Sequence, residues 1–299
     1  MYINFESIWI YLKLLQEYFR NILQWFHRSK RSKNLNGKVV VITGSANGIG
    51  REMCRLLNRF GCHLAMIDID HFTNKELASN LSSSSPSWTK TIAYKCDLTN
   101  LDEIDLIVGQ ILLDFDHIDI LINNAGYVNC KRIGSLSQDE IRRTFDVNIL
   151  SSIWLCKQLL PSMIENREGH IVAISSIAGL LGNANLVDYC ASKHAVIGMM
   201  KALELELDAQ NLNFIKLTTI CPLMISTGMF RKLHTRFQWL YPILTPESVA
   251  KSILDSIVRE DFLVTIPKHC RIATILESVC PRTLLKMAMK FLQYNCGEH

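Results

Sequence analysis

The chain has 299 residues, 48% of them hydrophobic and 20% charged, so it can bury the full core of one large or two small domains. A formal net charge of +4 is too small to indicate nucleic-acid binding, and the one dense basic run lies within residues 28–33. The ten cysteines include no C-x-x-C pair and no metal-ligand spacing. This pattern argues against a disulfide framework or a zinc site and favours reduced, mostly buried thiols.

Residues 1–27 have the pattern of an amphipathic helix. Charged side chains interrupt the apolar ones, so no run approaches the ~20 apolar residues of a spanning helix. No small-residue cleavage site follows, which argues against a removed secretory signal. With the basic linker at residues 28–36, the segment is predicted to lie on a lipid surface that faces the cytosol. The alternative is a helix packed on the protein's own body or on a second subunit. The apolar positions at helical spacing are Phe5, Ile8, Leu12, Leu15, Phe19, Ile22 and Phe26.

Residues 37–267 alternate short β-branched runs with longer helical patterns. This alternation predicts one α/β domain of the Rossmann type, a doubly wound parallel sheet of about seven strands with helices on both faces. A serine-rich run at residues 82–86 is interpreted as a surface loop. The candidate strands are 38–43, 62–67, 91–95, 118–122, 170–175, 214–220 and 262–266. The candidate helices are 49–60, 100–115, 138–166, 187–209 and 246–260.

A glycine-rich turn follows the first candidate strand. Gly44, Gly48 and Gly50 open a helix whose amide groups and dipole can hold a pyrophosphate. Asp68 ends the second strand, where a carboxylate can accept hydrogen bonds from both adenosine ribose hydroxyls and would repel the 2'-phosphate of NADP. No basic side chain stands at residues 45–47, so NAD is the predicted cofactor. The alternative for Asp68 is a solvated turn residue.

A second constellation carries proton chemistry. Tyr189 and Lys193 stand four residues apart, so a helix places them on one face, and the ammonium group can favour ionisation of the phenol. Ser176 lies upstream at the end of a candidate strand. Each residue also has a plain alternative: a tyrosine or lysine on a helix is usually surface or packing, Ser176 can simply end a strand, and Asn148 can cap a turn. The joint spacing beside a dinucleotide turn favours the catalytic interpretation.

Over residues 36–267 the sequence resembles the short-chain dehydrogenase/reductase family. The match rests on Thr43-Gly-x-x-x-Gly-Ile-Gly50, Cys96-Asp97-Leu98, Asn123-Asn-Ala-Gly126, Asp146-Val-Asn148, Ser176 and Tyr189-x-x-x-Lys193. Most of the family has glycine after the proline at position 222, whereas Leu223 stands here.

The resemblance implies a role for each of these residues. Tyr189 would be the general acid/base, Lys193 would also bind the nicotinamide ribose, Ser176 would hold the substrate oxygen, and Asn148 would hold a relay water. A homodimer through residues 138–166 and 187–209 is implied as well. The residues implied in cofactor binding are Gly44, Ser45, Asn47, Gly48, Ile49, Gly50, Asp68, Asp97, Leu98, Asn124, Ala125, Gly126, Tyr189, Lys193, Pro222, Ile225 and Thr227.

The N-terminal segment and Cys221-Pro-Leu-Met-Ile-Ser-Thr-Gly228 look like the branch with 17-beta-hydroxysteroid dehydrogenases types 11 and 13 and epidermal retinol dehydrogenases. That branch implies an endoplasmic reticulum membrane or a lipid droplet as the location. The presumed substrate segments are apolar, which favours a hydroxysteroid, retinol or related lipid. The tail at residues 268–299 is amphipathic and suits either a second lipid contact or a cover for the sheet edge. The apolar candidates are Leu180, Leu181, Leu186, Met224, Met229 and Phe230.

The sequence therefore predicts an NAD-dependent oxidoreductase that transfers a hydride between the cofactor and a lipophilic alcohol or ketone. Two alternatives remain open. One is a lipid-surface scaffold that binds NAD with little turnover. The joint presence of Asn148, Ser176, Tyr189 and Lys193 counts against it, because such a scaffold has no chemical need for all four. The other is a soluble carbonyl reductase that uses NADP.

Overall fold

The computed structural model describes residues 33–84, 86–229 and 242–292, together with Trp9, Leu12, Lys13, Leu15, Gln16, Glu17 and Arg20. Those seven N-terminal residues are helical, and the rest of the predicted amphipathic segment lies outside the described residues. The described residues from Leu35 onward form one compact unit by themselves. Within the described part of the chain, no helix combines the length and the hydropathy needed to cross a bilayer.

The core of this unit is a parallel sheet of seven strands in the order β3-β2-β1-β4-β5-β6-β7. Every predicted strand is confirmed to within two residues. Short β-branched runs form these strands because their side chains pack on both faces of the sheet, and Val40, Val41 and Ile42 are fully buried. The strands are β1 (Val39–Thr43), β2 (His63–Asp68), β3 (Thr91–Lys95), β4 (Ile120–Asn123), β5 (Gly169–Ile174), β6 (Ile215–Pro222) and β7 (Leu263–Ile266).

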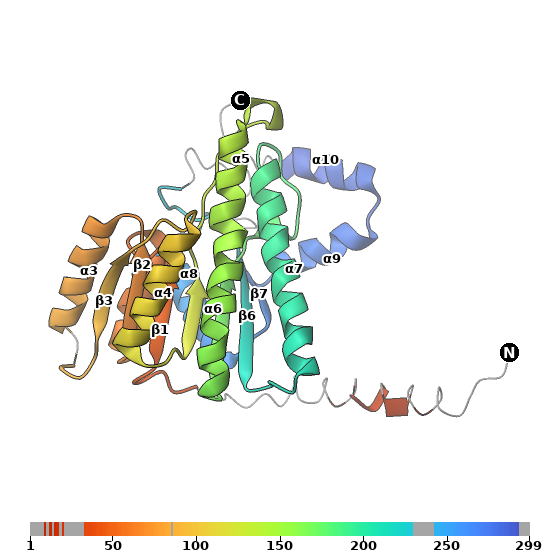
Figure 1. The fold of residues 1–299 in the computed structure, drawn as a ribbon. Coiled ribbons are helices and arrows are strands. Elements are labelled where there is room, and N and C mark those ends of the chain that lie inside the picture. The colour runs from red at the N-terminus through yellow and green to blue at the C-terminus, as the bar shows by residue number, and fades with distance from the viewer. Residues whose placement is uncertain are drawn as a thin grey trace. The chain divides into compact units, whose positions relative to one another are not determined.

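Helices cover both faces, which gives three layers. Side chains of α2 (Gly48–Arg59), α3 (His71–Ser84) and α8 (Pro246–Arg259) join one apolar cluster on one face of the sheet. Side chains of α4 (Leu101–Phe115), α6 (Ser151–Glu165) and α7 (Val187–Ala209) join a second cluster on the other face, which is the front in Figure 1. The predicted tail contains two helices, α9 (Cys270–Val279) and α10 (Arg282–Leu292).

Helix α3 was not predicted, and the interpretation of the serine-rich run at residues 82–86 as a loop is wrong for Ser82, Ser83 and Ser84. Ser82, Ser83 and Ser84 form the last turn of α3, where each hydroxyl donates to a backbone carbonyl three or four residues earlier. These bonds let the hydroxyls stay on the helix instead of competing with it, and the bond to Leu81 satisfies one carbonyl that the end of the helix leaves open. Only Leu77, Ala78 and Leu81 bury apolar surface on this helix, so its periodicity is weak in the sequence.

The helix predicted over residues 138–166 is interrupted. It consists of α5 (Gln138–Phe145), a π-helical turn η2 (Asp146–Leu150) and α6. Ser137 begins α5 with a capping box, because its hydroxyl accepts from the amide of Glu140 and the Glu140 side chain accepts from the amide of Ser137. The π-turn lies beside the site described below.

Most of the described cysteines agree with the expectation of buried, reduced thiols. Cys54, Cys62, Cys96, Cys156, Cys190, Cys221 and Cys270 are free and buried. Cys130 departs from the expectation, because its sulfur is in a disulfide.

Strand order reverses between β1 and β4, since the chain first builds the sheet outward to β3 and then returns to the other side of β1. In such sheets the loops at the carboxyl ends of the two central strands diverge and leave a crevice. The glycine-rich turn after β1 and the Asn124–Gly126 segment after β4 flank this point.

Candidate active site

A cavity of about 810 Å³ opens at the carboxyl ends of the strands. It brings together most of the residues that the sequence singled out, from segments far apart in the chain. Ser45, Gly50 and Asn148 are the predicted site residues that do not line it. Those that do are Gly44, Asn47, Gly48, Ile49, Asp68, Asp97, Leu98, Asn124, Ala125, Gly126, Ser176, Tyr189, Lys193, Pro222, Ile225 and Thr227.

The glycine-rich turn is closed by backbone contacts that leave no room for side chains. Gly44 has φ +65°, and a Cβ there would lie 3.0 Å from the Cα of Ala125. A Cβ on Gly50 would lie 2.0 Å from the carbonyl oxygen of Gly44. Gly50 therefore lets α2 start close against β1, and this cradle fits the pyrophosphate of a dinucleotide.

Ser45 has a structural position within the turn. It is fully buried, and its hydroxyl lies 3.1 Å from the carbonyl oxygen of Ile67 and 2.8 Å from Oδ1 of Asn74. Asn74, on α3, donates in turn to the carbonyl of Met66. The Ser45 hydroxyl therefore fixes the turn against β2 and α3, and the cofactor contact predicted for Ser45 stays a prediction.

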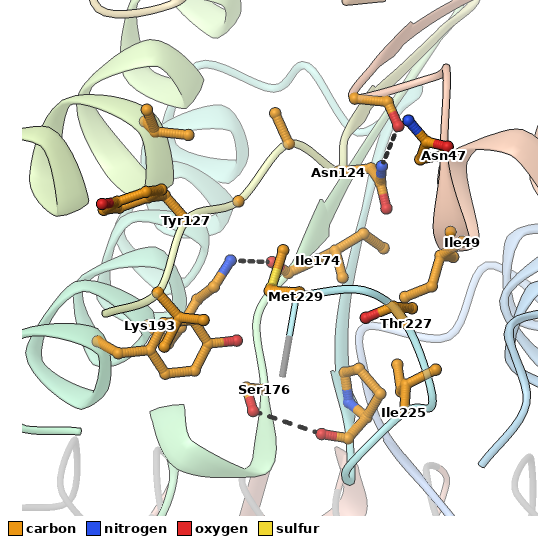
Figure 2. Close-up of a pocket in the computed structure, with 18 of the residues that line it drawn as sticks. Asn47, Ile49, Asn124, Tyr127, Ile174, Ser176, Lys193, Ile225, Thr227 and Met229 are labelled. Carbon is orange, nitrogen blue, oxygen red and sulfur yellow. Dashed lines mark hydrogen bonds between the residues drawn. The ribbon is translucent and has the colours of Figure 1, made fainter. Parts of the chain in front are cut away.

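Asn124 connects the glycine-rich turn to the end of β4. Its side-chain amide donates to the carbonyl of Thr43 at 2.9 Å and to that of Gly44 at 3.1 Å, as Figure 2 shows for one of these bonds. The hydroxyl of Thr43 accepts from the amides of Asn124 and Ala125, both at 3.0 Å. The two loops that flank the crevice are thus one hydrogen-bonded unit.

Asp68 stands at the end of β2 with both carboxylate oxygens directed by main-chain amides. Oδ2 accepts from Ala46 at 2.8 Å and Oδ1 from Asp70 at 2.9 Å. A carboxylate oxygen has further acceptor capacity for ribose hydroxyls. Among the described residues that line the cavity, the cations are Arg143, which lies over the Tyr127 ring, and Lys193. Neither engages Asp68 in an ion pair.

The proposed proton-transfer residues meet on the opposite side of the cavity. Tyr189 and Lys193 lie in the first turns of α7, and both are at most 5% exposed. The Lys193 ammonium donates to the carbonyl of Ile174 at 2.8 Å and lies 5.8 Å from the centre of the Tyr189 ring. Ser176 Oγ lies 3.5 Å from the carbonyl oxygen of Pro222 (Figure 2) and accepts from the amide of Ala178 at 3.1 Å.

The electrostatics of this group differ from the sequence-based expectation. Burial raises the pKa of Tyr189 well above its usual range, and a hydrogen bond with Ser176 opposes only part of that rise. Burial also lowers the pKa of Lys193 to about 8. The lysine was expected to lower the pKa of the phenol, but desolvation determines the direction of both pKa shifts.

Asn148 lies behind the cavity wall. It sits on η2, its Oδ1 accepts from the amide of Tyr127 at 2.7 Å, and its Nδ2 donates to the carbonyl of Tyr127 and to Ser192 Oγ, both at 2.9 Å. A Cβ on Gly126 would lie 3.6 Å from Asn148 Oδ1 and 3.7 Å from Lys193 Nζ. Asn148 thus fixes the segment after β4 through both its side-chain oxygen and its side-chain nitrogen.

The segment after β6 lies over the start of α2. The methyl group of Thr227 would be 3.2 Å from a Cβ on Gly48, and Ile225 forms a bridge with Leu244. Leu186, Met224 and Met229 line the cavity as predicted from their apolar character. Leu180 and Leu181 instead pack against a small cluster of Ile177, Leu223 and Cys270, and Phe230 lies outside the described residues.

Several cavity residues were missed by the sequence analysis. They come from irregular segments or from a helix face that shows no motif, so only their proximity to motifs in the chain could have suggested them. The side chains concerned are Ile69, Tyr127, Val128 and Arg143.

Comparisons with known proteins agree with this geometry. Residues 38–237 match the family model described as short chain dehydrogenase. The chain is 35% identical to epidermal retinol dehydrogenase 2 of Mus musculus over 281 residues, 93% of this chain and 90% of that protein. It is 32% identical to 17-beta-hydroxysteroid dehydrogenase 13 of Rattus norvegicus over 273 residues, 91% and 89% of the two chains.

One solved structure has the same fold. A short chain dehydrogenase/reductase from Burkholderia phymatum, in complex with NAD, superimposes with a TM-score of 0.71. It covers 89% of this chain and 99% of its own, at 23% sequence identity.

Proposed function

We propose that this chain, which belongs to the short-chain dehydrogenase/reductase family, oxidises a lipophilic alcohol with NAD and catalyses the reverse reduction. The observation that carries the proposal is the convergence of Ser176, Tyr189 and Lys193 in the cavity that also holds the glycine-rich turn and Asp68. A site for a dinucleotide and a proton donor thus face one another across a single space.

Each residue has a defined part in the reaction. A bound nicotinamide dinucleotide supplies the hydride acceptor or donor. In the reduction, Tyr189 gives a proton to the substrate oxygen, and its raised pKa keeps it protonated at neutral pH. In the oxidation, the ionised phenol takes the proton of the alcohol. Ser176 Oγ can donate a hydrogen bond to the same oxygen. Lys193, with a pKa of about 8, keeps most of its charge at pH 7 and stabilises negative charge that develops on the phenol.

NAD is the cofactor we propose, with Asp68 as the selecting residue. Its two oxygens are oriented by the amides of Ala46 and Asp70, so the carboxylate is in position before a ribose arrives. A 2'-phosphate would meet this negative charge and no paired cation. Asp97 and Leu98 complete the same end of the cavity.

The proposed substrate is a hydroxysteroid, a retinol or a related lipid. Apolar side chains from three segments of the chain line the cavity near Tyr189. Val128, Leu186 and Met224 are examples, one from each segment. The similar proteins named above include a retinol dehydrogenase and a hydroxysteroid dehydrogenase, which supports this class.

A lipid surface is the location that suits such a substrate, and we propose the endoplasmic reticulum membrane or a lipid droplet with the catalytic domain in the cytosol. Trp9, Leu12 and Leu15 are 60%, 59% and 47% exposed on the N-terminal helical segment, as an interfacial helix requires. We also propose a homodimer through α6 and α7, where Ile153 and Leu205 expose apolar surface.

The direct test is a panel of steroid, retinoid and fatty alcohols incubated with the purified protein and either NAD or NADP. Formation of the reduced cofactor is followed by its absorbance at about 340 nm. We expect turnover of at least one lipophilic alcohol with NAD, and a fall in that turnover of about 10³-fold in Tyr189→Phe. Dinucleotide binding without turnover of any alcohol or of the matching ketone would instead support the scaffold, and a preference for NADP would overturn the assignment of Asp68.

A further inference from the structure

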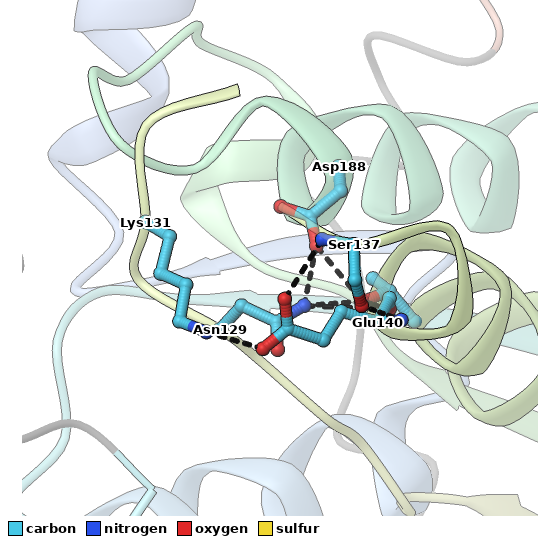
Figure 3. A network of polar contacts seen from close by, with 6 residues as sticks. Asn129, Lys131, Ser137, Glu140 and Asp188 are labelled. Carbon is cyan, nitrogen blue, oxygen red and sulfur yellow. Dashed lines mark hydrogen bonds and ion pairs between the residues drawn. The ribbon is translucent and has the colours of Figure 1, made fainter. Parts of the chain in front are cut away.

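A buried carboxylate immediately precedes the proposed proton-transfer residue. Asp188 is 3% exposed in the first turn of α7, next to Tyr189. Its Oδ2 accepts from Nδ2 of Asn129 and from Oγ1 of Thr144, both at 2.8 Å (Figure 3). Its Oδ1 is buried and has no hydrogen-bond partner among the described residues. This residue has no part in the proposed chemistry.

The contacts of Asp188 join three separate parts of the fold. Thr144 belongs to α5, Asn129 to the irregular segment after β4, and Asp188 itself to α7. Asn129 also donates to Thr144 Oγ1 at 3.1 Å, so the three side chains form a closed triangle. Burying a carboxylate without a cation is costly, and the amide dipoles at the start of α7 offset only part of that cost.

The rest of the network anchors the same segment on the solvent side. The Lys131 ammonium pairs with the Glu140 carboxylate on α5, and Glu140 also belongs to the capping box with Ser137. Upstream, the backbone of Tyr127 is held by Asn148. Asn129 is therefore the middle of three attachments. It bonds α7 directly through Asp188, and Asn148 reaches the same helix through Ser192.

The residues on either side of Asn129 form part of the wall that faces the phenol. Val128 and Cys130 pack against a small cluster of Ala178, Leu186, Tyr189 and Cys190, and Val128 also lines the cavity. Because the Asn129 side chain is bonded to Asp188, Val128 and Cys130 are held against that cluster. A shift of this segment would change the width of the space in front of Tyr189 and leave the glycine-rich turn untouched.

We propose that Asp188 is a positioning residue for the alcohol substrate: through Asn129 and Thr144 it sets the wall at Val128 relative to Tyr189. The inference rests on the proposed dehydrogenase function. It deepens that function because it assigns control of substrate fit to a residue outside the cavity. Binding of the dinucleotide is independent of this network.

The test compares steady-state kinetics of Asp188→Ala, Asp188→Asn and Asn129→Ala with the wild type, using the best alcohol of the panel and NAD. For Asp188→Ala we expect kcat/KM for the alcohol to fall by about tenfold or more, with the KM for NAD within about twofold. Asp188→Asn retains an oxygen that can accept both bonds, so it should stay within about threefold of the wild type. Asp208→Ala, an exposed carboxylate on the same helix, is the matched control.

A double-mutant cycle shows whether Asp188 acts through Asn129. Asp188→Ala with Asn129→Ala should lose no more activity than the more damaging single change, since both single changes remove the bond between these two side chains. Additive losses would refute that route. Equal rises in the KM for NAD and for the alcohol, or an Asp188→Asn variant as impaired as Asp188→Ala, would overturn the proposal.

Two binding measurements separate this inference from the function on which it rests. Retinol binding is followed by retinol fluorescence, and NADH binding by NADH fluorescence. If the wild type binds retinol but oxidises no alcohol, the proposed function fails. The positioning role is then decided by whether Asp188→Ala weakens retinol binding by about tenfold and leaves NADH binding unchanged. Unchanged retinol binding would overturn it.

Discussion

The two halves of the cavity are built in different ways. The dinucleotide half is made mainly of backbone at the ends of β1, β2 and β4, where Gly44, Gly50 and Asn124 bring chain segments into contact. The substrate half is made of side chains from irregular segments, among them Val128 and Leu186. Tyr189 and Lys193 lie between the two.

This difference decides what each half can tolerate. A backbone cradle accepts only the residue types that fit its geometry, so a single methyl group can close it. An apolar wall accepts many combinations of valine, leucine and methionine with the same total volume. The first half therefore determines the cofactor class strictly, whereas the second determines the substrate only as a class. Four variants test this division.

The largest effect is expected for Tyr189→Phe, which separates chemistry from binding in both halves. Loss of the phenol hydroxyl should lower kcat by about 10³-fold, because general acid/base catalysis contributes about 10² to 10⁴. NADH binding, measured by fluorescence, should stay within about twofold. Tyr94→Phe is the matched control, since Tyr94 is equally buried and bonds Asp114 instead. A loss of NADH binding in Tyr189→Phe would show that the halves are not separable.

Gly50→Ala damages the dinucleotide half alone. Its Cβ would lie 2.0 Å from the Gly44 carbonyl oxygen, so α2 must move away from β1. We expect a loss of about 1–3 kcal/mol in the free energy of unfolding, as for overpacked sites, and at least a tenfold rise in the KM for NAD. Gly109→Ala on α4 meets open space and should stabilise the fold by up to about 1 kcal/mol. Urea unfolding measures both, and an unchanged KM for NAD in Gly50→Ala would contradict the cradle.

Lys193→Met tests the boundary between the halves through the pH dependence of stability. Burial lowers the folded-state pKa of Lys193 from 10.5 to about 8, so above pH 8 the unfolded chain binds more protons than the folded one. The wild type should therefore gain about 1.4 kcal/mol relative to Lys193→Met between pH 7 and pH 9, the equivalent of about one pKa unit. Below pH 7 the difference between the two proteins should be constant.

The measurement is urea unfolding of both proteins at matched pH values. Burial raises the pKa of thiols such as Cys54 and Cys221, which destabilises the fold at higher pH, but both proteins share that effect. Parallel stability curves would mean that Lys193 carries no burial penalty.

Asp68→Ser should have the smallest effect and alter only the choice of cofactor. Removing the carboxylate should shift the ratio of kcat/KM for NAD over NADP by about tenfold toward NADP, roughly 1.4 kcal/mol. The KM for the alcohol should not change. Asp70→Ser, at the exposed neighbour of Asp68, should leave the ratio unchanged. An identical shift in both variants would point to the general field of the loop and not to Asp68.

The sequence predicted the sheet and the dinucleotide half because their constraints are local. A buried strand followed by Gly44 and Gly50 has few other interpretations, and β1 extends almost as predicted. Helix α3 was not predicted because most of its residues are polar, so its sequence shows little hydrophobic periodicity. Tyr127 and Arg143 were not predicted as cavity residues, because their position there depends on how α5 packs beside the segment after β4.

Asn148 illustrates a different limit. Its position in the chain was recognised, but its bonds to Tyr127 and Ser192 exist only because three separate segments meet there. The pKa values of Tyr189 and Lys193 show the same limit. The spacing in the sequence predicted that the two side chains lie on one helix face. The direction of both pKa shifts depends on burial, which the spacing does not reveal.

The π-turn at Asp146–Leu150 also limits which insertions and deletions the protein can accept in this stretch. Side chains on an α-helix are about 100° apart, so one extra residue in a turn rotates everything beyond it by about that angle. Thr144 before the turn meets Asp188, and Leu155 after it packs toward the sheet, only with that rotation in place. We therefore expect single-residue deletions here to be far more harmful than substitutions at positions other than Asn148, and natural variants of this stretch to keep one length.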